Sequence, residues 1–381
     1  MKNNKGFWAE LDLPIIGLSP MDGVTDASMR YIAKKHGHPS VVYTEFVSAE
    51  GLWRIKKRGE MEHKIWQELR YSEEERPVVA QIFGSDPESF YEASKIVCEL
   101  GFDGIDINMG CPSPGLERRG GGAGLIRDKC NAVEVVEATR KGVADFFSAI
   151  QSTQSSCSHA STSLRSEGVS ARDFGTSELL EKKNADAIPV SLKTRVGSDK
   201  PDRKWWELIA SLQMPLVAMH GRTFKQLYSG FADWDLLLEA GEIIRESGAL
   251  FLGNGDIKKV KSKKVKGKSA EGFEIVTSSD RVIDLKGKMD GVLVGRGAIG
   301  NPWILDCRSS IVDRSIGERL AVAVEHAKKF EELLPEQKFF VMRKHLVGYA
   351  SGFDNASEIR RRLVQTNSAA EVEEVVRGFV G

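Results

Sequence analysis

Short apolar runs recur eight times along the chain, and each run ends in Gly, Pro, Asn or a charged residue. Several of them, such as Val78–Ala80 and Val292–Val294, contain no alternating polar positions. This pattern is typical of parallel strands that are covered on both faces. The predicted strands are Pro14–Met21, Val41–Ser48, Pro77–Gly84, Gly104–Gly110, Pro189–Gly197, Leu216–Arg222, Leu250–Ile257 and Gly291–Ala298.

Amphipathic segments separate these runs. Ser89–Leu100, for example, carries its apolar residues at the spacing of one helix face. Eight strand and helix repeats predict a closed (β/α)8 barrel of the TIM type. The alternative is a doubly wound open sheet, which usually has fewer strands and a glycine-rich turn after the first one. Here the first strand ends in Ser19–Gly23, which is not such a turn. In the later predicted strands the polar residues lie at the C-terminal ends, where barrel enzymes have their active sites, and this placement favours the barrel.

Two segments interrupt the repeat. Residues 148–186 are rich in serine and poor in large apolar side chains, which predicts a flexible surface excursion. Residues 258–290 begin with seven lysines in eleven positions and continue with Phe273–Val276 and Arg281–Leu285, which predict a small hairpin. We expect the lysine run to be a solvated loop. The alternative is a contact with an RNA backbone.

From residue 316 onward the pattern is purely helical. The helices predicted there, separated by Pro335, Gly352 and Asn367, are Arg319–Leu334, Glu336–Ala350, Glu358–Leu363 and Ala369–Phe379. We therefore expect a barrel over residues 1–315 and a small helical domain over residues 316–381. Its basic clusters, Arg343–His345 and Arg360–Arg362, are of a kind that usually forms solvated helix faces. Two such clusters in one small domain favour a contact with a phosphate backbone.

Composition and charge exclude several classes of protein. The 54 basic residues balance the 54 acidic ones, so the chain as a whole does not attract a polyanion. The five cysteines are far apart and include no Cys-x-x-Cys pair, which argues against a disulfide framework and a zinc site. Neither a signal peptide nor a membrane-length apolar run is found. We expect a cytoplasmic monomer without a metal.

Glycine-rich segments follow the seventh and eighth predicted strands. They are Gly253–Asp256 and Gly295–Gly297. In barrels the loops after these two strands typically bind the phosphate of a ligand, because glycine lets backbone N–H groups approach it. Arg296 can add a charged pair. The alternative is that the glycines only form tight turns. A cofactor with one phosphate, such as FMN, fits better than a dinucleotide, for which no fingerprint is present.

Three side chains at strand ends are candidates for chemistry. Lys193 interrupts an apolar run and is expected in the barrel mouth, as a donor to a flavin or substrate carbonyl or as part of a structural ion pair. His220 is followed closely by Arg222, which argues against a packing role. Cys111 lies on a glycine-rich loop that is expected to move as a lid. A thiol with a pKa of about 8.5 is mostly protonated at neutral pH and suits a proton donor.

Taken as a set, these residues resemble the tRNA-dihydrouridine synthases over nearly all of the chain outside the two insertions. The tail, with Met342–His345 and Arg360–Arg362, looks like that of the bacterial B-type branch. The segments that carry the resemblance are Ser19–Asp26, Thr44–Glu45, Gln81–Gly84, Asp106–Pro112, Lys193–Arg195, His220–Thr223 with Gln226 and Tyr228, Gly253–Ile257 and Gly295–Gly297.

The resemblance implies an FMN enzyme that reduces the C5–C6 double bond of D-loop uridines in tRNA, with NADPH or NADH as the reductant. Hydride would pass from flavin N5 to C6, and Cys111 would protonate C5 of a base that is flipped into the pocket. The residues implied for FMN are Pro20, Met21, Gln81, Asn108, Lys193, His220, Asn254, Gly255, Asp256, Gly295 and Arg296. Those implied for the RNA substrate are Asn108, Lys193, Arg222, Arg343 and Lys344.

Two other functions remain open. A different FMN barrel, such as a dihydroorotate dehydrogenase, also acts on the C5–C6 bond of a pyrimidine, but it leaves the helical tail unused. A tRNA-binding protein without catalysis would use the tail. The presence of Asn108, Cys111, Lys193 and His220 together argues against that reading.

Overall fold

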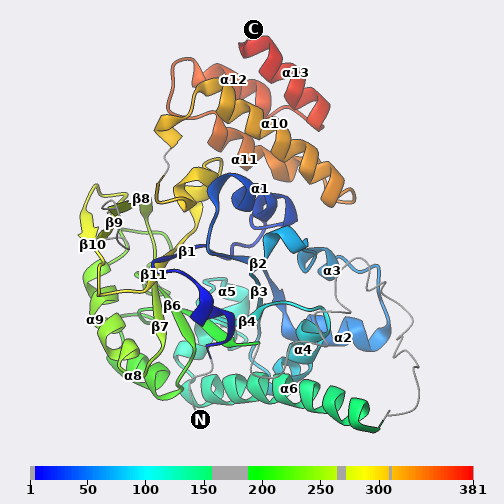
Figure 1. Ribbon diagram of the computed structural model, residues 1–381, viewed down its shortest axis with the longest axis vertical. Coiled ribbons are helices and arrows are strands. Elements are labelled where there is room, and N and C mark those ends of the chain that lie inside the picture. Colours follow the sequence, from blue (N-terminus) through cyan, green and yellow to red (C-terminus); the bar gives the residue numbers. More distant parts are fainter. Residues whose placement is uncertain (1–4, 157–187, 264–271, 309–310, 381) are drawn as a thin grey trace.

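A closed barrel of eight parallel strands forms the body of the molecule (Figure 1). The computed structural model describes residues 5–156, 188–263, 272–308 and 311–380. Strand order around the barrel follows the chain, so that β11 closes against β1. All eight predicted strands are confirmed, and with them the (β/α)8 fold. The strands are β1 (Ile15–Leu18), β2 (Val41–Ser48), β3 (Val78–Phe83), β4 (Gly104–Met109), β5 (Val190–Arg195), β6 (Leu216–His220), β7 (Leu250–Asn254) and β11 (Gly291–Val294).

Helices alternate with the strands and cover the outside of the barrel (Figure 1). The main helix starts are set by capping carboxylates: Asp26 accepts the N–H of Met29, and Asp86 accepts that of Ser89. The helix predicted at Ser89–Leu100 is α4. The helices of the barrel are α1 (Ala27–Gly37), α2 (Ala49–Arg58), α3 (Ile65–Glu68), α4 (Pro87–Glu99), α5 (Pro114–Glu117), α6 (Lys129–Ser156), α8 (Arg203–Ser211) and α9 (Trp234–Arg245).

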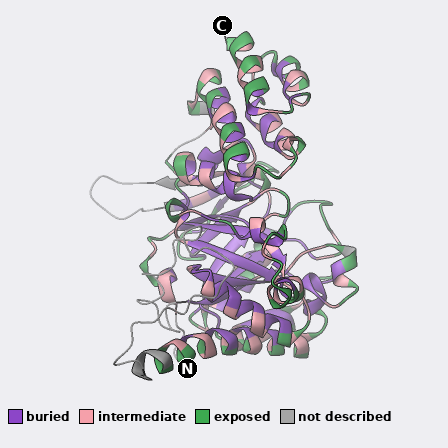
Figure 2. Cartoon of the chain, turned by 90° about the vertical axis from the view of Figure 1, so that its right-hand side faces the viewer, coloured by how far each residue is buried: buried purple, intermediate pink, exposed green. Residues whose placement is uncertain are grey.

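The strands are buried on both faces (Figure 2), as their unbroken apolar pattern predicts. Within the barrel, Tyr43, Val79, Leu216 and other apolar side chains pack under Trp8, which belongs to the short helix η1 (Gly6–Glu10). Trp8 is fully buried. The N-terminal end of the barrel is therefore closed by apolar side chains, and the polar groups lie at the C-terminal end.

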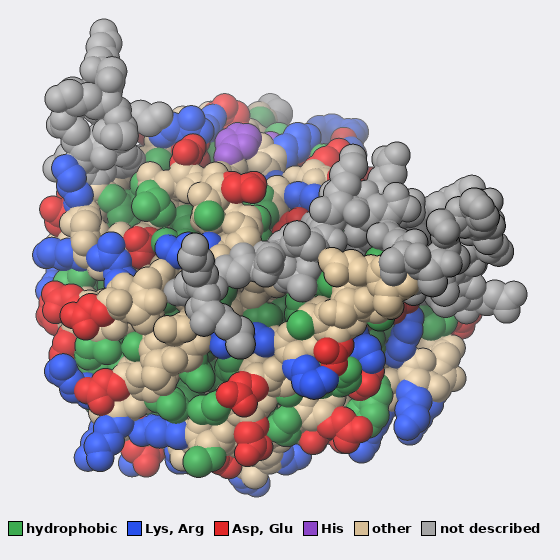
Figure 3. Space-filling model, turned by 60° about the horizontal axis from the view of Figure 1, so that its bottom comes forward, with side chains coloured by type: hydrophobic (Ala, Val, Ile, Leu, Met, Phe, Trp, Pro, Cys, Tyr) green, Lys and Arg blue, Asp and Glu red, His purple; other side chains and the backbone are tan. Residues whose placement is uncertain are grey.

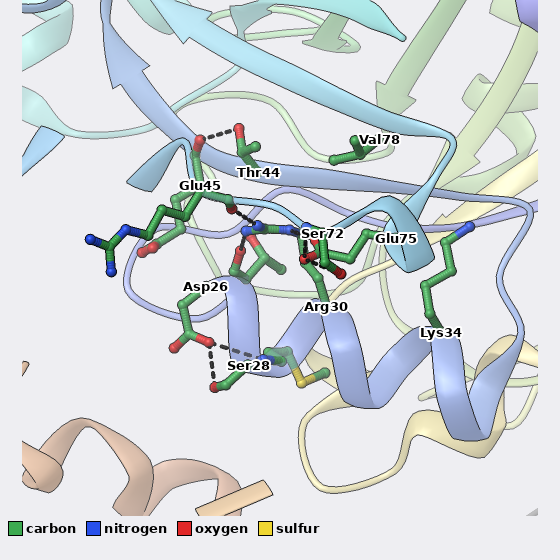
Figure 4. Close-up of polar contacts among 12 residues, drawn as sticks. Asp26, Ser28, Arg30, Lys34, Thr44, Glu45, Ser72, Glu75 and Val78 are labelled. Atoms are coloured by element: carbon green, nitrogen blue, oxygen red, sulfur yellow. Dashed lines mark hydrogen bonds and ion pairs between the residues drawn. The ribbon is translucent and has the colours of Figure 1, made fainter. Parts of the chain in front are cut away.

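A polar network fixes the loop between β1 and α1 (Figure 4). Arg30 and Glu75 form a fully buried ion pair at 2.6 Å, and Arg30 also donates to the carbonyl of Thr25 at 2.7 Å. Glu45 accepts the N–H of Gly23 at 2.6 Å. A buried ion pair with these additional partners is costly to disrupt. The network holds the loop that carries Pro20 and Met21 to the barrel mouth.

The lysine-rich insertion folds as an antiparallel sheet of three strands, β8 (Ile257–Lys263), β9 (Gly272–Thr277) and β10 (Val282–Asp284). The predicted hairpin corresponds to β9 and β10. We expected the lysine run to be a solvated loop, but its first part forms strand β8. Its apolar residues Ile257 and Val260 are buried, which stabilises the extended conformation. The rest of the run lies outside the described residues.

The serine-rich insertion begins as a helix rather than a loop. Residues 148–156 extend α6, whereas the rest of the predicted excursion lies outside the described residues. In the part that the structure does describe, no helix has the length and apolar character needed to cross a membrane, and no three His, Cys, Asp or Glu side chains are grouped as a metal site requires. Figure 3 shows acidic and basic side chains interspersed over the face that it draws.

Helices after the barrel pack around a separate core. They are α10 (Ile316–Leu333), α11 (Arg343–Tyr349), α12 (Ala356–Leu363) and α13 (Ala369–Val380). This core includes Ile32 of α1 and Trp303 of the short helix η7 (Pro302–Leu305), so the helical domain rests on the first helix of the barrel (Figure 1). His326 links the two parts, with Nε2 3.2 Å from Oγ of Ser28. The exact domain boundary stays a prediction.

Candidate active site

A cavity of about 1470 Å³ opens at the C-terminal ends of the barrel strands. Its lining also includes residues of the insertion sheet and of the helical domain. A typical pocket for one small ligand is about 300–1,000 Å³, so this cavity has room for more than one. The predicted residues that it brings together are Pro20, Met21, Gln81, Asn108, Cys111, Lys193, His220, Asn254, Gly255, Asp256, Gly295 and Arg296.

A chain of directed hydrogen bonds connects β3 and β4 to the Cys111 loop. The Asp106 carboxylate accepts from Nε2 of Gln81 at 2.6 Å, and Oε1 of Gln81 accepts from Nδ2 of Asn108 at 2.9 Å. Oδ1 of Asn108 then accepts the N–H groups of Gly110 and Cys111, at 3.0 and 2.8 Å. An ionised carboxylate can only accept, so Asp106 sets the orientation of both amides.

Asp106 is itself buried at the centre of this chain. Ser191 donates to its other oxygen at 2.6 Å. Burial raises the pKa of Asp106 to about 6, against the opposing effect of the hydrogen bonds from Ser191 and Gln81. The carboxyl group is therefore mostly ionised at neutral pH and becomes protonated as the pH falls below about 6.

Cys111 stands partly buried at the start of its loop, facing the cavity. Burial raises the pKa of the Cys111 thiol, which keeps its proton at neutral pH. Part of the glycine-rich segment is packed, because Gly122–Ile126 forms a buried 3₁₀ helix, η3; movement of the loop as a lid stays a prediction. A Cβ at Gly122 would lie 3.2 Å from Cβ of Cys111. These glycines are thus needed for close packing against the cysteine.

Lys193 and Arg195 lie two residues apart on β5 and both line the cavity. Arg195 donates to the carbonyl of Gly110 at 2.7 Å and to that of Thr223 at 3.1 Å. Lys193 makes no hydrogen bond or ion pair within the described chain. Burial, together with the charge of Arg195, lowers the pKa of Lys193 to about 8. Arg195 thus fastens the Cys111 loop, while the Lys193 ammonium group is free to donate to a ligand.

His220 presents a neutral hydrogen-bond donor. Its Nδ1 accepts the N–H of Arg222 at 3.1 Å, which places the proton on Nε2. Nε2 lies beside Gly255, where a Cβ would be 3.4 Å away. Burial and the nearby positive charges, Arg195 foremost, lower the pKa of His220 well below its ordinary value. The ring therefore acts as a donor without carrying a charge.

The ends of β7 and β11 expose bare backbone to the cavity. Gly255 has φ +127°, a conformation that side chains rarely allow. Asn254 donates to the carbonyl of Leu293 at 2.6 Å and so ties the two strand ends together. Gly295 lies beside Met21, because a Cβ there would be 3.5 Å from the Met21 sulfur. Adjacent glycine turns of this kind suit a phosphate group.

Asp256 and Arg222 form a buried ion pair at 2.7 Å. Asp256 also accepts the N–H of Ala232 at 2.7 Å, so its oxygens are engaged by the protein. Arg222 is only 2% exposed and does not line the cavity; its expected RNA contact stays a prediction that this burial does not favour. Arg296 is exposed: its guanidinium group lies 4.8 Å above the ring of Tyr228 and 3.6 Å from the Asp256 carboxylate.

Arg343 and Lys344 lie in the helical domain and do not line the cavity. Arg343 donates to Oδ1 of Asn367 at 3.0 Å. Lys344 is partly buried next to Gly23; burial lowers its pKa, and the carboxylates of Asp26 and others oppose that effect. Their contacts with RNA stay predictions. Within the helical domain, the residues that line the cavity are Gly348 of α11 and Ser351, which follows this helix.

Several cavity residues were not singled out from the sequence. Arg195 could have been found, because it follows Lys193 by two residues and strand alternation places both on one face. The lysines of β8 that line the cavity, Lys258, Lys259 and Lys261, gave a weaker signal. A register shift between Ile257 and Lys259 breaks the alternation there, and the strand resembles a charged loop.

Comparison with known families decides the class of protein. The model of the dihydrouridine synthase (Dus) family matches residues 17–151 and 177–379. The chain belongs to the dihydrouridine synthase family. The match omits most of the serine-rich insertion and includes the helical domain. The family expected from the sequence, and an oxidoreductase as its kind of enzyme, are thereby confirmed. The assignment to the B-type branch stays a prediction.

Members of this family from two bacteria are similar over the full length. A probable tRNA-dihydrouridine synthase of Staphylococcus aureus (strain MRSA252) is 29% identical over 386 residues, covering 100% of this chain and 96% of the relative. A probable tRNA-dihydrouridine synthase 2 of Bacillus subtilis (strain 168) is 28% identical, covering 98% and 97%. Among solved structures, morphinone reductase matches with 11% identity and a TM-score of 0.40, covering 77% of this chain and 85% of that one.

Proposed function

We propose that this member of the dihydrouridine synthase family reduces the C5–C6 double bond of D-loop uridines in tRNA, with FMN as its cofactor and NADPH or NADH as the reductant. The observation that carries the proposal is the convergence of a protonated thiol, an unpaired ammonium group and a neutral imidazole donor on one cavity. They belong to Cys111, Lys193 and His220. Family membership supplies the reaction class.

The residues present fit FMN. Gly255 and Gly295 leave bare backbone where a phosphate needs close approach, and Arg296 adds an exposed charge beside them. Lys193 and Nε2 of His220 are donors without a hydrogen-bond acceptor within the described chain. These groups would hold the phosphate and the ring system. When bound and reduced, the flavin supplies the hydride for the pyrimidine double bond.

Cys111 is suited to supply the proton. Its raised pKa keeps the thiol protonated at neutral pH, and Asn108 and Arg195 hold its loop from two sides. A general acid fixed in place in this way typically contributes about 10²–10⁴-fold to the rate. In this proposal Cys111 gives its proton to C5 of the uracil.

Lys193 is suited to stabilise charge on the substrate. Addition of hydride at C6 pushes negative charge toward the C4 carbonyl. Hydrogen-bond donors that are already in place near this oxygen stabilise the transition state. With a pKa of about 8, Lys193 is still mostly charged at neutral pH. The amide of Asn108 lies on the neighbouring strand, in register with Lys193, and would act with it.

The substrate base must leave the RNA stack to reach this site. Cys111 lies within the barrel mouth, and a stacked base cannot enter such a pocket. A uridine flipped out of the stack would enter this cavity beside the Cys111 thiol, together with the bound cofactor. The cavity is large enough for both, at about 1470 Å³.

Purified protein tests the proposal directly. We expect a yellow protein whose extracted cofactor is FMN. Incubation with NADPH and tRNA from cells that lack dihydrouridine should produce dihydrouridine, measured by mass spectrometry of the digested RNA. Fully modified tRNA is the control and should gain none. A protein without flavin, or with flavin but no dihydrouridine product, would contradict the proposal.

A further inference from the structure

The insertion sheet has two different faces. Val260, Ile275 and Ile283 are buried on one side, while Lys259 and Lys261 line the cavity on the other. Strand alternation places Lys259 and Lys261 on the same face, with Val260 between them on the other face. In the pairing with β9, Val260 lies opposite Ile275, whereas Lys259 lies opposite Val276, which also lines the cavity. One face of the sheet is therefore apolar and buried, and the other presents lysines to the cavity.

These lysines can change partners easily. Lys258 pairs with Asp280 at 2.6 Å, and Lys261 pairs with Glu274 at 3.4 Å, with both lysines well exposed to solvent. An exposed pair such as Lys258–Asp280 contributes about 0–1 kcal/mol, so a phosphate can replace the carboxylate. Lys259 forms no ion pair within the described residues. The sheet therefore concentrates three ammonium groups at the cavity of a protein whose formal net charge is zero.

The arrangement fits an extended phosphate backbone better than a compact diphosphate. Lys259 and Lys261 lie about 7 Å apart along the strand, so that each can contact a different phosphate. A dinucleotide diphosphate is usually held by a glycine-rich turn at a helix N-terminus, and β8 has neither. Lysines act as point charges toward a nucleic-acid backbone, which they position without reading its sequence.

The place of the sheet agrees with this occupant. The cavity that Lys258, Lys259 and Lys261 line also contains Cys111 and extends to Gly348 and Ser351 of the helical domain. A flipped uridine at Cys111 leaves its flanking phosphates near the rim of the same cavity. The sheet and the helical domain then border the RNA strand from two sides.

We propose that Lys258, Lys259 and Lys261 of β8, here called the lysine wall, bind the RNA phosphates that flank the flipped uridine. The inference rests on the proposed function and deepens it, because it assigns part of the tRNA contact to an insertion in the barrel. The wall contributes affinity for RNA and leaves cofactor binding and the reaction with the reductant unchanged.

A double variant, Lys259→Ala with Lys261→Ala, tests the wall in the full-length protein. We expect the Kd for undermodified tRNA to rise about tenfold at about 0.1 M salt, and the slope of log Kd against log salt to fall by about 1.5. The matched control is Lys286→Ala with Lys288→Ala, which removes the same charge from exposed positions of the same insertion outside the cavity. It should bind tRNA like the wild type.

The remaining outcomes separate this inference from its basis. Flavin content and the KM for NADPH should be equal in all three proteins. An unchanged tRNA affinity and salt slope in the wall variant would overturn the inference, and so would a raised KM for NADPH with normal tRNA binding, which would assign the wall to the reductant. The charge reversal Lys259→Glu changes the charge by the same amount as the double variant and should also weaken tRNA binding. If the wall variant loses tRNA affinity but the wild type forms no dihydrouridine, the proposed function fails and the RNA contact stands.

Discussion

Two regions of this molecule bury histidines in similar ways but differ in what surrounds them. At the barrel mouth, His220 lies opposite Arg195 of the neighbouring strand, and His220 and Lys193 both line a large cavity. At the seam between the barrel and the helical domain, His326 and His345 pack with ring centroids 4.7 Å apart and ring planes inclined by 58°. Neither of them lines the cavity. Burial lowers the pKa of all three histidines.

The difference shows that a shifted pKa alone does not mark a site. The histidine rings are desolvated in both regions, but only at the barrel mouth do the hydrogen-bond donors line a cavity that can hold a ligand. At the seam, His326 contacts Ser28 and Tyr349 at 3.2 and 3.1 Å, so its hydrogen bonds are used inside the protein. Changes at the mouth should therefore affect turnover, and changes at the seam should affect stability.

Substitution of Cys111 should have the largest effect. Cys111→Ala removes the proposed acid and should lower turnover about 10³-fold, equivalent to about 4 kcal/mol, with FMN content and tRNA affinity retained. Single-turnover reoxidation of the reduced flavin by undermodified tRNA measures it. Cys130→Ala, at an exposed cysteine, is the control and should react normally. Wild-type rates in Cys111→Ala would exclude Cys111 as the proton donor.

Substitution of Asp106 should lower turnover, because Asp106 orients the side-chain amides of Gln81 and Asn108. In Asp106→Asn the new amide can donate to Gln81, which allows Gln81 and then Asn108 to reverse and removes the acceptor for the Cys111 N–H. We expect kcat to fall about 10- to 100-fold while FMN remains bound. Ser191→Ala removes one donor to the same carboxylate without reversing the chain, and it should cost much less. Equal losses in both variants would contradict the directed chain.

The same carboxyl group predicts a pH dependence of turnover. Because burial raises the pKa of Asp106 to about 6, the wild-type kcat should fall as the pH decreases through about 6. In Asp106→Asn this limb of the profile should be absent. Its persistence in the variant would assign the limb to another group.

Substitution of His345 at the seam should have the smallest effect, and it should change the free energy of unfolding and not turnover. Burial lowers the pKa of His345 to about 3, so the folded protein binds no proton there while the unfolded chain does below about 6.5. Stability is therefore lost as the pH falls, by about 1 kcal/mol for this histidine between pH 7 and about 5.5. In His345→Phe, urea unfolding at the two pH values should show a correspondingly smaller difference. The exposed His63, as His63→Gln, is the control and should leave the difference unchanged.

The sequence was sufficient for the barrel and for most of the site. Carboxyl ends of parallel strands meet at one end of a barrel, so residues in or just after the C-terminal halves of the strands, such as Gln81, Lys193 and Gly295, had to converge once the strands were identified. Side chains beyond the strands were harder to place. Arg222 lies two residues after the end of β6, but it does not line the cavity and pairs with Asp256 instead.

The remaining differences have a common physical cause. The glycines after Cys111 are compatible with either a flexible backbone or close packing. Only the segments that lie next to them in the fold show that these glycines are packed. Similarly, a run of lysines indicates a solvated loop until the buried partners of Ile257 and Val260 are known. Tertiary contacts between distant segments decide both cases, and local sequence patterns do not contain them.

The most direct test of the whole account compares two substrates on the same reduced enzyme. Protein reduced with NADPH under anaerobic conditions is mixed with undermodified tRNA or with orotate, and flavin absorbance is followed. The account predicts rapid reoxidation by tRNA, with one dihydrouridine formed for each flavin oxidised, and no reoxidation by orotate. Reoxidation by orotate but not by tRNA would contradict it and would indicate an enzyme that acts on free pyrimidines.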